Sequence, residues 1–434
     1  MNRRVLALAG LLTLVAAALA TAQAPGVTRS RLPNGLTVIV RENSAAPVVA
    51  FSLLVKMGTR TETQQDAGIS NMLQIMLVRG TEKMNGEQIA AAADRMGGSI
   101  DAYGDADYSE IAATALARNW MPMLELVADV ALRPTIPDGT VSPVRDFLLR
   151  QIRNRGDKPF DVGVDQTRVA LFGADHPYAW DPLGRRESVE RLTRDALLAH
   201  YRRHYTPEQM VLAVSGDVKA AEVFAQVQRL FASMPPGTAQ QRPLPAPAPM
   251  SAGREVFIVP GAQAQIFMAA QAPAFSHPDY APLKVMTALL GGGMASRLFS
   301  DLRDQQALAY TTGAQYPPRM DTSGFAAILG TAPANVPKAE AALREHLIRI
   351  QDEPASEEEV AVARSYVVGS QAMDRRTNAR QAWYLAAGEL AGLPPDFFDV
   401  YAANVRKVTP ADVQRVARKY LGVMRVVVVQ PPRG

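Results

Sequence analysis

Apolar positions along the chain recur at two spacings, which predict helices and strands arranged in blocks. Apolar residues three and four positions apart are typical of helices, and short β-branched runs are typical of strands. In the first part of the chain, strand-like segments span residues 36–40 and 48–55, and helical segments span 68–79, 85–96, 120–132 and 144–155. In the later part, strand-like segments 256–259 and 266–270 precede helical segments 280–290, 295–306 and 338–350. The same order of elements is therefore predicted twice.

The ends of the two parts also match each other. Thr193 opens a predicted helix that leads to a strand at 210–215, and Thr409 opens one that leads to a strand at 423–429. A threonine oxygen can accept a backbone N–H in the first turn of a helix. An internal duplication of roughly 200 residues explains this repetition.

A stretch rich in proline, alanine and glycine at 236–253 interrupts the periodic pattern, as an extended linker would. It separates a predicted N-terminal domain, residues 25–235, from a predicted C-terminal domain, residues 254–434. Because strands and helices come in blocks, we expect an α+β fold with two homologous domains, each an antiparallel sheet with packed helices.

The first 22 residues have the pattern of a secretory signal peptide. Arg3 and Arg4 precede an apolar run over 5–20, and small residues follow at 20–22. We therefore expect a periplasmic or secreted protein without a stable membrane span after signal removal. The alternative is an anchor formed by the uncleaved N-terminal segment, for which the run is short.

Composition narrows the possible functions. The 434 residues are 48% hydrophobic and 20% charged, which is typical of a soluble globular protein. The net charge of +4 falls to +2 without the signal, and no basic stripe is interleaved with aromatics, so nucleic acid is not an expected partner. Cysteine is absent, so any metal site must use His, Asp or Glu. Of the five histidines, His200 and His204 lie four apart beside two arginines, and we expect a surface helix without metal there.

The segment 68–81 reads GISNMLQIMLVRGT. It resembles the zinc helix of the insulinase-like (pitrilysin) peptidases, G-[LI]-[AS]-H-x-x-E-H-[ML]-x-x-x-G-T. In that pattern two histidines four residues apart bind zinc, and the glutamate is the general base for the attacking water. These three positions correspond to Asn71, Gln74 and Ile75, and the family's more distant third ligand, a glutamate, corresponds to Gln151.

None of these four side chains is ionisable. An amide cannot supply an anionic ligand or take up a proton, and isoleucine cannot coordinate a metal. The sequence therefore predicts a degenerate zinc site with no cofactor bound in this chain. Under the resemblance, zinc is expected in a partner subunit that carries the intact motif.

A second segment, RLFSDLRDQQALAY at 297–310, resembles the family signature R-L-F-x-x-[LI]-R-x-x-x-x-L-[AG]-Y. The resemblance implies that Arg303 and Tyr310 face the zinc across the substrate chamber and donate hydrogen bonds to the peptide backbone and the oxyanion. The alternative places Arg303 on a solvated helix face and Tyr310 at the start of a buried strand.

In this family, zinc and the arginine-tyrosine pair lie in different halves of a clamshell, and two-chain members such as the mitochondrial processing peptidase divide these halves. The resemblance thus implies one half of a clamshell. We expect the non-catalytic subunit of a heterodimeric zinc metallopeptidase, binding peptide or unfolded polypeptide and supplying Arg303 and Tyr310 in trans. One alternative is a homodimeric peptide-binding or assembly module without hydrolysis, and another is an enzyme with an unrecognised site.

Overall fold

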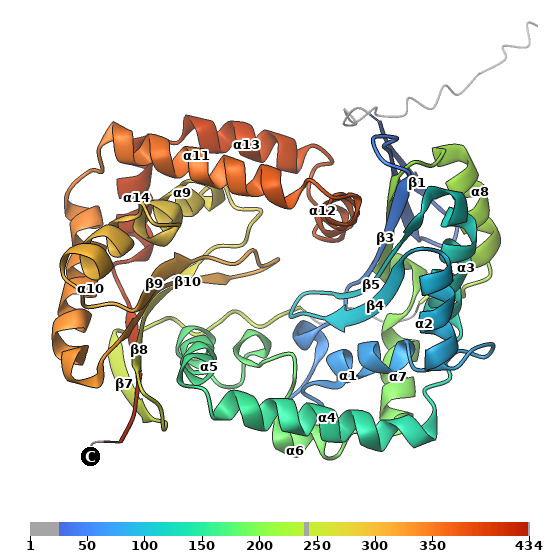
Figure 1. The fold of residues 1–434 in the computed structure, drawn as a ribbon, viewed down its shortest axis with the longest axis horizontal. Coiled ribbons are helices and arrows are strands. Elements are labelled where there is room, and N and C mark those ends of the chain that lie inside the picture. The colour runs from blue at the N-terminus through green and yellow to red at the C-terminus, as the bar shows by residue number, and fades with distance from the viewer. Residues whose placement is uncertain (1–25, 238–242, 433–434) are drawn as a thin grey trace, which may run out of the picture.

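The computed structural model describes residues 26–237 and 243–432, in which two sheets lie in separate halves of the molecule (Figure 1). The predicted signal segment, residues 1–22, lies outside the described residues. The first sheet contains β1 (Val27–Arg31), β2 (Thr37–Glu42), β3 (Val48–Val55), β4 (Ser99–Gly104), β5 (Ser109–Leu116) and β6 (Met210–Gly216). The second contains β7 (Gly253–Ile258), β8 (Ala264–Ala272), β9 (Thr311–Gln315), β10 (Ser323–Thr331) and β11 (Arg425–Gln430).

Helices cover both sheets, which confirms the α+β class. The first half of the chain contributes α1 (Ile69–Leu77), α2 (Gly86–Arg95), α3 (Trp120–Leu132), α4 (Asp138–Gly156), α5 (Pro159–Phe172), α6 (Arg186–Val189), α7 (Arg194–His204) and α8 (Ala220–Phe231). The second contributes α9 (Tyr280–Gly291), α10 (Val336–Asp352), α11 (Glu357–Asp374), α12 (Asn378–Leu390), α13 (Phe397–Lys407) and α14 (Pro410–Tyr420). The helix predicted over 295–306 is a shorter π-helical turn, Phe299–Gln305.

Both sheets are mostly antiparallel, as expected, but each also contains one parallel pair. The strand orders are β1-β2-β6-β3-β5-β4 and β7-β11-β8-β10-β9. β6 lies between β2 and β3, pairing parallel to β2 and antiparallel to β3. β11 lies in the same way between β7 and β8. A strand inserted between two strands of opposite direction must run parallel to one of them. Because the same insertion occurs in both sheets, it also supports the predicted duplication.

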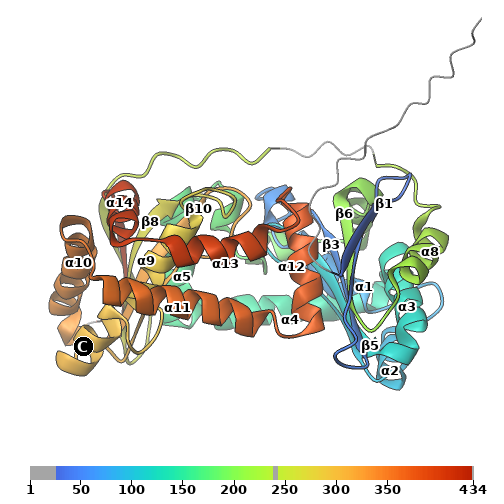
Figure 2. The same cartoon turned by 90° about the horizontal axis from the view of Figure 1, so that it is seen from above.

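Each half lends one helix to the sheet of the other half. α12 packs on β3 and β6 of the first sheet, and α5 packs on β8 and β11 of the second. Figures 1 and 2 show α12 lying against the first sheet at the far end of α11, away from the helices of its own half. Three alanines of α12, Ala382, Ala386 and Ala387, are buried there among Ile39, Leu54, Val211 and Ala213. Alanine lets a helix approach a sheet closely, so these contacts hold the two halves together.

The reciprocal contact of α5 is closer still. A Cβ placed on Gly163 would lie 2.0 Å from Cε2 of Phe267, whose ring is fully buried among Val427, Val429 and Phe160. We expect Gly163→Ala to lower the free energy of unfolding by about 1–3 kcal/mol, because overpacking outweighs alanine's better helix propensity.

Gly369 provides a matched control. It lies in α11, and no atom of another segment lies within 4 Å of the position that its Cβ would take, so Gly369→Ala should stabilise the protein by about 0.5–1 kcal/mol. Chemical denaturation of both variants measures the difference. Equal effects of the two substitutions would contradict the close approach of α5 to the second sheet.

Candidate functional site

The helix that carries the degenerate zinc motif, α1, has a buried and well-capped N-terminus. Gly68 adopts a left-handed conformation with φ 94°, and a Cβ there would lie 2.8 Å from Cα of Gly184. The Glu62 carboxyl accepts hydrogen bonds from the backbone N–H groups of Gly68 and Ser70, both at 2.9 Å. Burial raises the pKa of Glu62 to about 7, although these two N–H donors oppose the shift. The start of α1 is thus fixed by backbone geometry and by a buried acid.

The four predicted metal positions lie on two helices that pack together, α1 and α4. Asn71 and Ile75 are half-buried and one turn apart, so they share a face of α1, and Gly104 of β4 lies against the backbone of Asn71. Gln74 is fully buried, and its Nε2 donates to the Tyr205 hydroxyl at 2.8 Å. Gln151 is exposed on α4, three residues after the buried Leu148.

This donor set does not fit a zinc ion. Gln74 directs its amide to Tyr205, and its Oε1 is buried without a hydrogen-bond partner in the described structure. Ile75 presents only carbon atoms, and Asn71 and Gln151 are neutral amides. Over residues 26–237 and 243–432, no group of three or more His, Cys, Asp or Glu side chains is arranged to hold a metal ion. We therefore derive no metal-dependent step at these positions.

The pair His200 and His204 was expected on a surface helix; α7 does expose Arg202 and Arg203, but the two histidines lie on its buried face. Both imidazoles are 7% exposed, and their ring centroids lie 4.5 Å apart on the face of α7 that packs against α1. His200 Nε2 lies 3.0 Å from Ser70 Oγ, and burial lowers the pKa to about 3 for His200 and about 4 for His204. Two neutral rings therefore pack behind α1, which explains why they can be buried beside two arginines.

The second predicted pair lies in the other half of the chain. Arg303 is in the π-helical turn Phe299–Gln305, with its guanidinium 4.6 Å from the ring centroid of Phe299. Tyr310 directly precedes β9, and its side chain is 57% exposed while its backbone N–H bonds the Gly330 carbonyl. Among the described residues, neither side chain has a hydrogen bond or an ion pair. Both polar groups are therefore free to meet a molecule outside the chain.

The structure also contains a cavity that the sequence analysis missed. Its volume is about 630 Å³, and its walls come from α9, α11, α12 and the β9–β10 connection, together with the β4–β5 turn of the other half. Lys284 lies on its wall and is the only charged residue of α9, the helix YAPLKVMTALLG. A single lysine within an apolar helix was the signal in the sequence that could have indicated this cavity.

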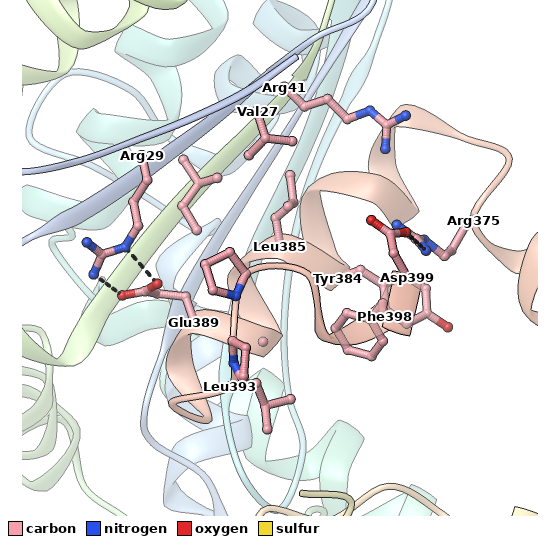
Figure 3. Close-up of a pocket in the computed structure, with 14 residues that line it drawn as sticks. Val27, Arg29, Arg41, Arg375, Tyr384, Leu385, Glu389, Leu393, Phe398 and Asp399 are labelled. Carbon is pink, nitrogen blue, oxygen red and sulfur yellow. Dashed lines mark hydrogen bonds and ion pairs between the residues drawn. The ribbon is translucent and has the colours of Figure 1, made fainter. Parts of the chain in front are cut away.

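A smaller pocket lies where α12 and α13 meet the edge of the first sheet (Figure 3). Arg29 of β1 forms an ion pair with Glu389 at 2.5 Å, and Arg375 forms one with Asp399 at 3.0 Å. Arg41 donates to Gln381 Oε1 at 2.6 Å. These polar contacts surround the docked end of α12, and we assign them to holding that helix in place.

Within the described part of the chain, helices are too short or too polar to cross a membrane. This finding concerns residues 26–237 and 243–432 only.

Comparisons with known proteins agree with the geometry. The family Insulinase (Peptidase family M16) matches residues 37–171, and the Peptidase M16 inactive domain matches residues 191–367. The sequence is 30% identical to an uncharacterized zinc protease of Mycobacterium leprae over 356 residues, which cover 80% of this chain and 79% of that protein. It is 27% identical to an uncharacterized zinc protease of Streptomyces coelicolor over 405 residues, covering 91% and 87%.

Solved structures share the same fold. The peptidase M16 inactive domain from Pseudomonas fluorescens superimposes with a TM-score of 0.88 at 21% identity, covering 94% of this chain and 99% of that one. A protease from Helicobacter pylori superimposes with a TM-score of 0.85 at 22% identity, covering 94% and 100%. The degenerate α1 motif, the two sheets and these matches together show that the chain belongs to the insulinase family of peptidases, family M16.

Proposed function

We propose that this protein is the non-catalytic subunit of a heterodimeric M16 zinc metallopeptidase in the periplasm. The observation that carries the proposal is the replacement of every metal-site position on α1 and α4 within an intact helical framework. A partner chain with the intact motif would hold the zinc ion. This chain would bind the peptide or unfolded substrate and complete the chamber.

Arg303 and Tyr310 are the residues assigned to the chemistry in trans. Their exposure and lack of partners within the described chain support this role, because a donor already engaged in its own fold could not serve a substrate. A guanidinium and a phenol are strong hydrogen-bond donors to an oxyanion in a chamber that excludes water. We assign both residues to stabilising the developing negative charge of the scissile carbonyl.

The test is co-expression with an M16 chain that carries the intact zinc motif. We expect a stable complex that cleaves peptides, and a loss of kcat of about 10²-fold for Arg303→Ala and for Tyr310→Phe. Arg406→Ala, which removes another exposed arginine, should leave kcat unchanged.

Two outcomes would contradict the proposal. Unchanged cleavage by the Arg303→Ala and Tyr310→Phe complexes would remove the role in trans. Failure to form any complex, with a homodimer found instead, would favour a peptide-binding or assembly module without hydrolysis. The size of the purified species, measured by light scattering, separates these cases.

A further inference from the structure

Nine of the 28 residues that line the cavity of about 630 Å³ are aromatic. They include Tyr280, Tyr316, Tyr366, Trp383, Tyr384 and Tyr401. This volume falls within the range of pockets that bind small ligands, and such pockets combine an apolar lining with a few polar groups that orient the ligand. The lining therefore provides the apolar part of a binding site.

The polar group that stands out is the Lys284 ammonium. Its Nζ donates to the Tyr316 carbonyl at 3.1 Å and lies 5.9 Å from the ring centroids of both Tyr280 and Tyr316. A lysine ammonium has three donors, and a ring centroid at 5.9 Å is near the outer limit of a cation–π interaction. Burial lowers the pKa of Lys284, with no compensating acid. In the described structure, the ammonium thus lacks a counter-ion.

The other charged groups on the wall already have partners. Arg319 pairs with Asp105 at 3.1 Å and lies 3.8 Å from Asp107, and Arg380 pairs with Asp374 at 2.8 Å. Lys284 therefore differs from its charged neighbours, because a cation in a partly dehydrated site without an anion costs free energy. An anionic group entering the cavity would remove that cost.

We propose that this cavity is a binding site for a carboxylate carried on an apolar or aromatic body. The Lys284 ammonium would pair with the carboxylate, and the tyrosine and tryptophan rings would surround the body. The same chemistry is offered by a small arylalkyl acid and by the C-terminal residue of a peptide with a hydrophobic side chain. The site belongs to this chain alone and does not depend on a zinc-bearing partner.

Isothermal titration of the full mature chain tests the site with four probes. The two acids are 3-phenylpropanoate and the tripeptide alanyl-alanyl-phenylalanine, and their amides are the neutral controls. We expect at least one acid to bind at least about tenfold more tightly than its amide, because hydrogen bonds to charged groups are the stronger ones. Binding of the small acid alone identifies a small-molecule site, and binding of the peptide acid identifies a site for peptide C-termini.

Variants show whether Lys284 is the group responsible. Lys284→Met and Lys284→Gln should abolish the difference between acid and amide, and Lys338→Met, an exposed lysine of α10, should behave as the wild type. A thermal melt checks that each variant is folded. Equal binding of acid and amide by the wild type, binding unchanged in both Lys284 variants, or no binding of either acid at millimolar concentration would overturn the proposal. Failure of complex formation in the co-expression test would leave it standing.

Discussion

Restoring the four metal positions, by combining Asn71→His, Gln74→Glu, Ile75→His and Gln151→Glu, is expected to create a chain that binds one zinc ion with a Kd of about 1 µM or tighter. Asn71 and Ile75 lie one turn apart on α1, which packs against the helix that carries Gln151. Gln74 faces the Tyr205 hydroxyl, which can donate to a glutamate carboxylate instead of accepting from the amide. Asn71 is half-buried and Gln151 is exposed, so these two changes lie outside the core, whereas Ile75 is half-buried and packs against it.

Equilibrium dialysis with metal analysis measures the zinc content. The wild type and a triple variant that retains Asn71 are the controls, and both should bind zinc at least about 10²-fold more weakly, since each lost ligand weakens a three-ligand site. If the folded quadruple variant took up no more zinc than the wild type, α1 and α4 would not place these positions where side chains could bind zinc. The inference of an intact helical framework would then be wrong.

Removing the carboxylate of Asp107 is expected to have the largest effect on stability, about 3–5 kcal/mol for Asp107→Ala. The residue is 3% exposed, and its carboxylate accepts hydrogen bonds from Arg60 at 2.9 Å, from the Tyr178 hydroxyl, and from the Met320 backbone N–H at 3.2 Å. Arg319 also lies 3.8 Å away. Asp107 thus joins groups from both halves of the chain, and its loss would leave two largely buried guanidinium groups with less compensating charge.

The exposed pair of Arg186 and Glu190 provides the comparison, with a separation of 3.5 Å and side chains 47% and 49% exposed. Glu190→Ala should cost at most about 0.5 kcal/mol, because solvent screens exposed pairs. Urea denaturation at one pH measures both free energies of unfolding. If Asp107→Ala cost no more than Glu190→Ala, the junction of the two halves would not depend on this charged cluster.

Local signals in the sequence predicted the position of helix α1, but not the packing of α7 against it. Gly68 and the periodic segment after it identified the helix, and the motif positions Asn71, Gln74 and Ile75 indicated a site without metal ligands. The burial of His200 and His204 could not be predicted, because the pattern of charges on α7 is that of a solvated helix, and only packing against α1 shows otherwise.

Features that join distant segments were beyond the sequence pattern. β6 lies between β2 and β3 in the sheet, although more than five helices separate it from β3 along the chain. The spacing of apolar residues shows which face of a strand is buried, but not which strands pair with each other. The helices α5 and α12 were not predicted from the sequence pattern, and nothing local shows that each covers the sheet of the other half. The functional roles of Arg303 and Tyr310 stay predictions.

The exchange of α5 and α12 also constrains the order in which the protein can fold during synthesis. β6 is the last strand of the first sheet to be synthesised. The face of β3 and β6 nevertheless stays uncovered until α12, residues 378–390, has left the ribosome. The second sheet in turn needs β11, which lies near the C-terminus. The main core of the first half comes from residues of that half alone, so we expect only the face that α12 covers to stay open to proteases until most of the chain has been made.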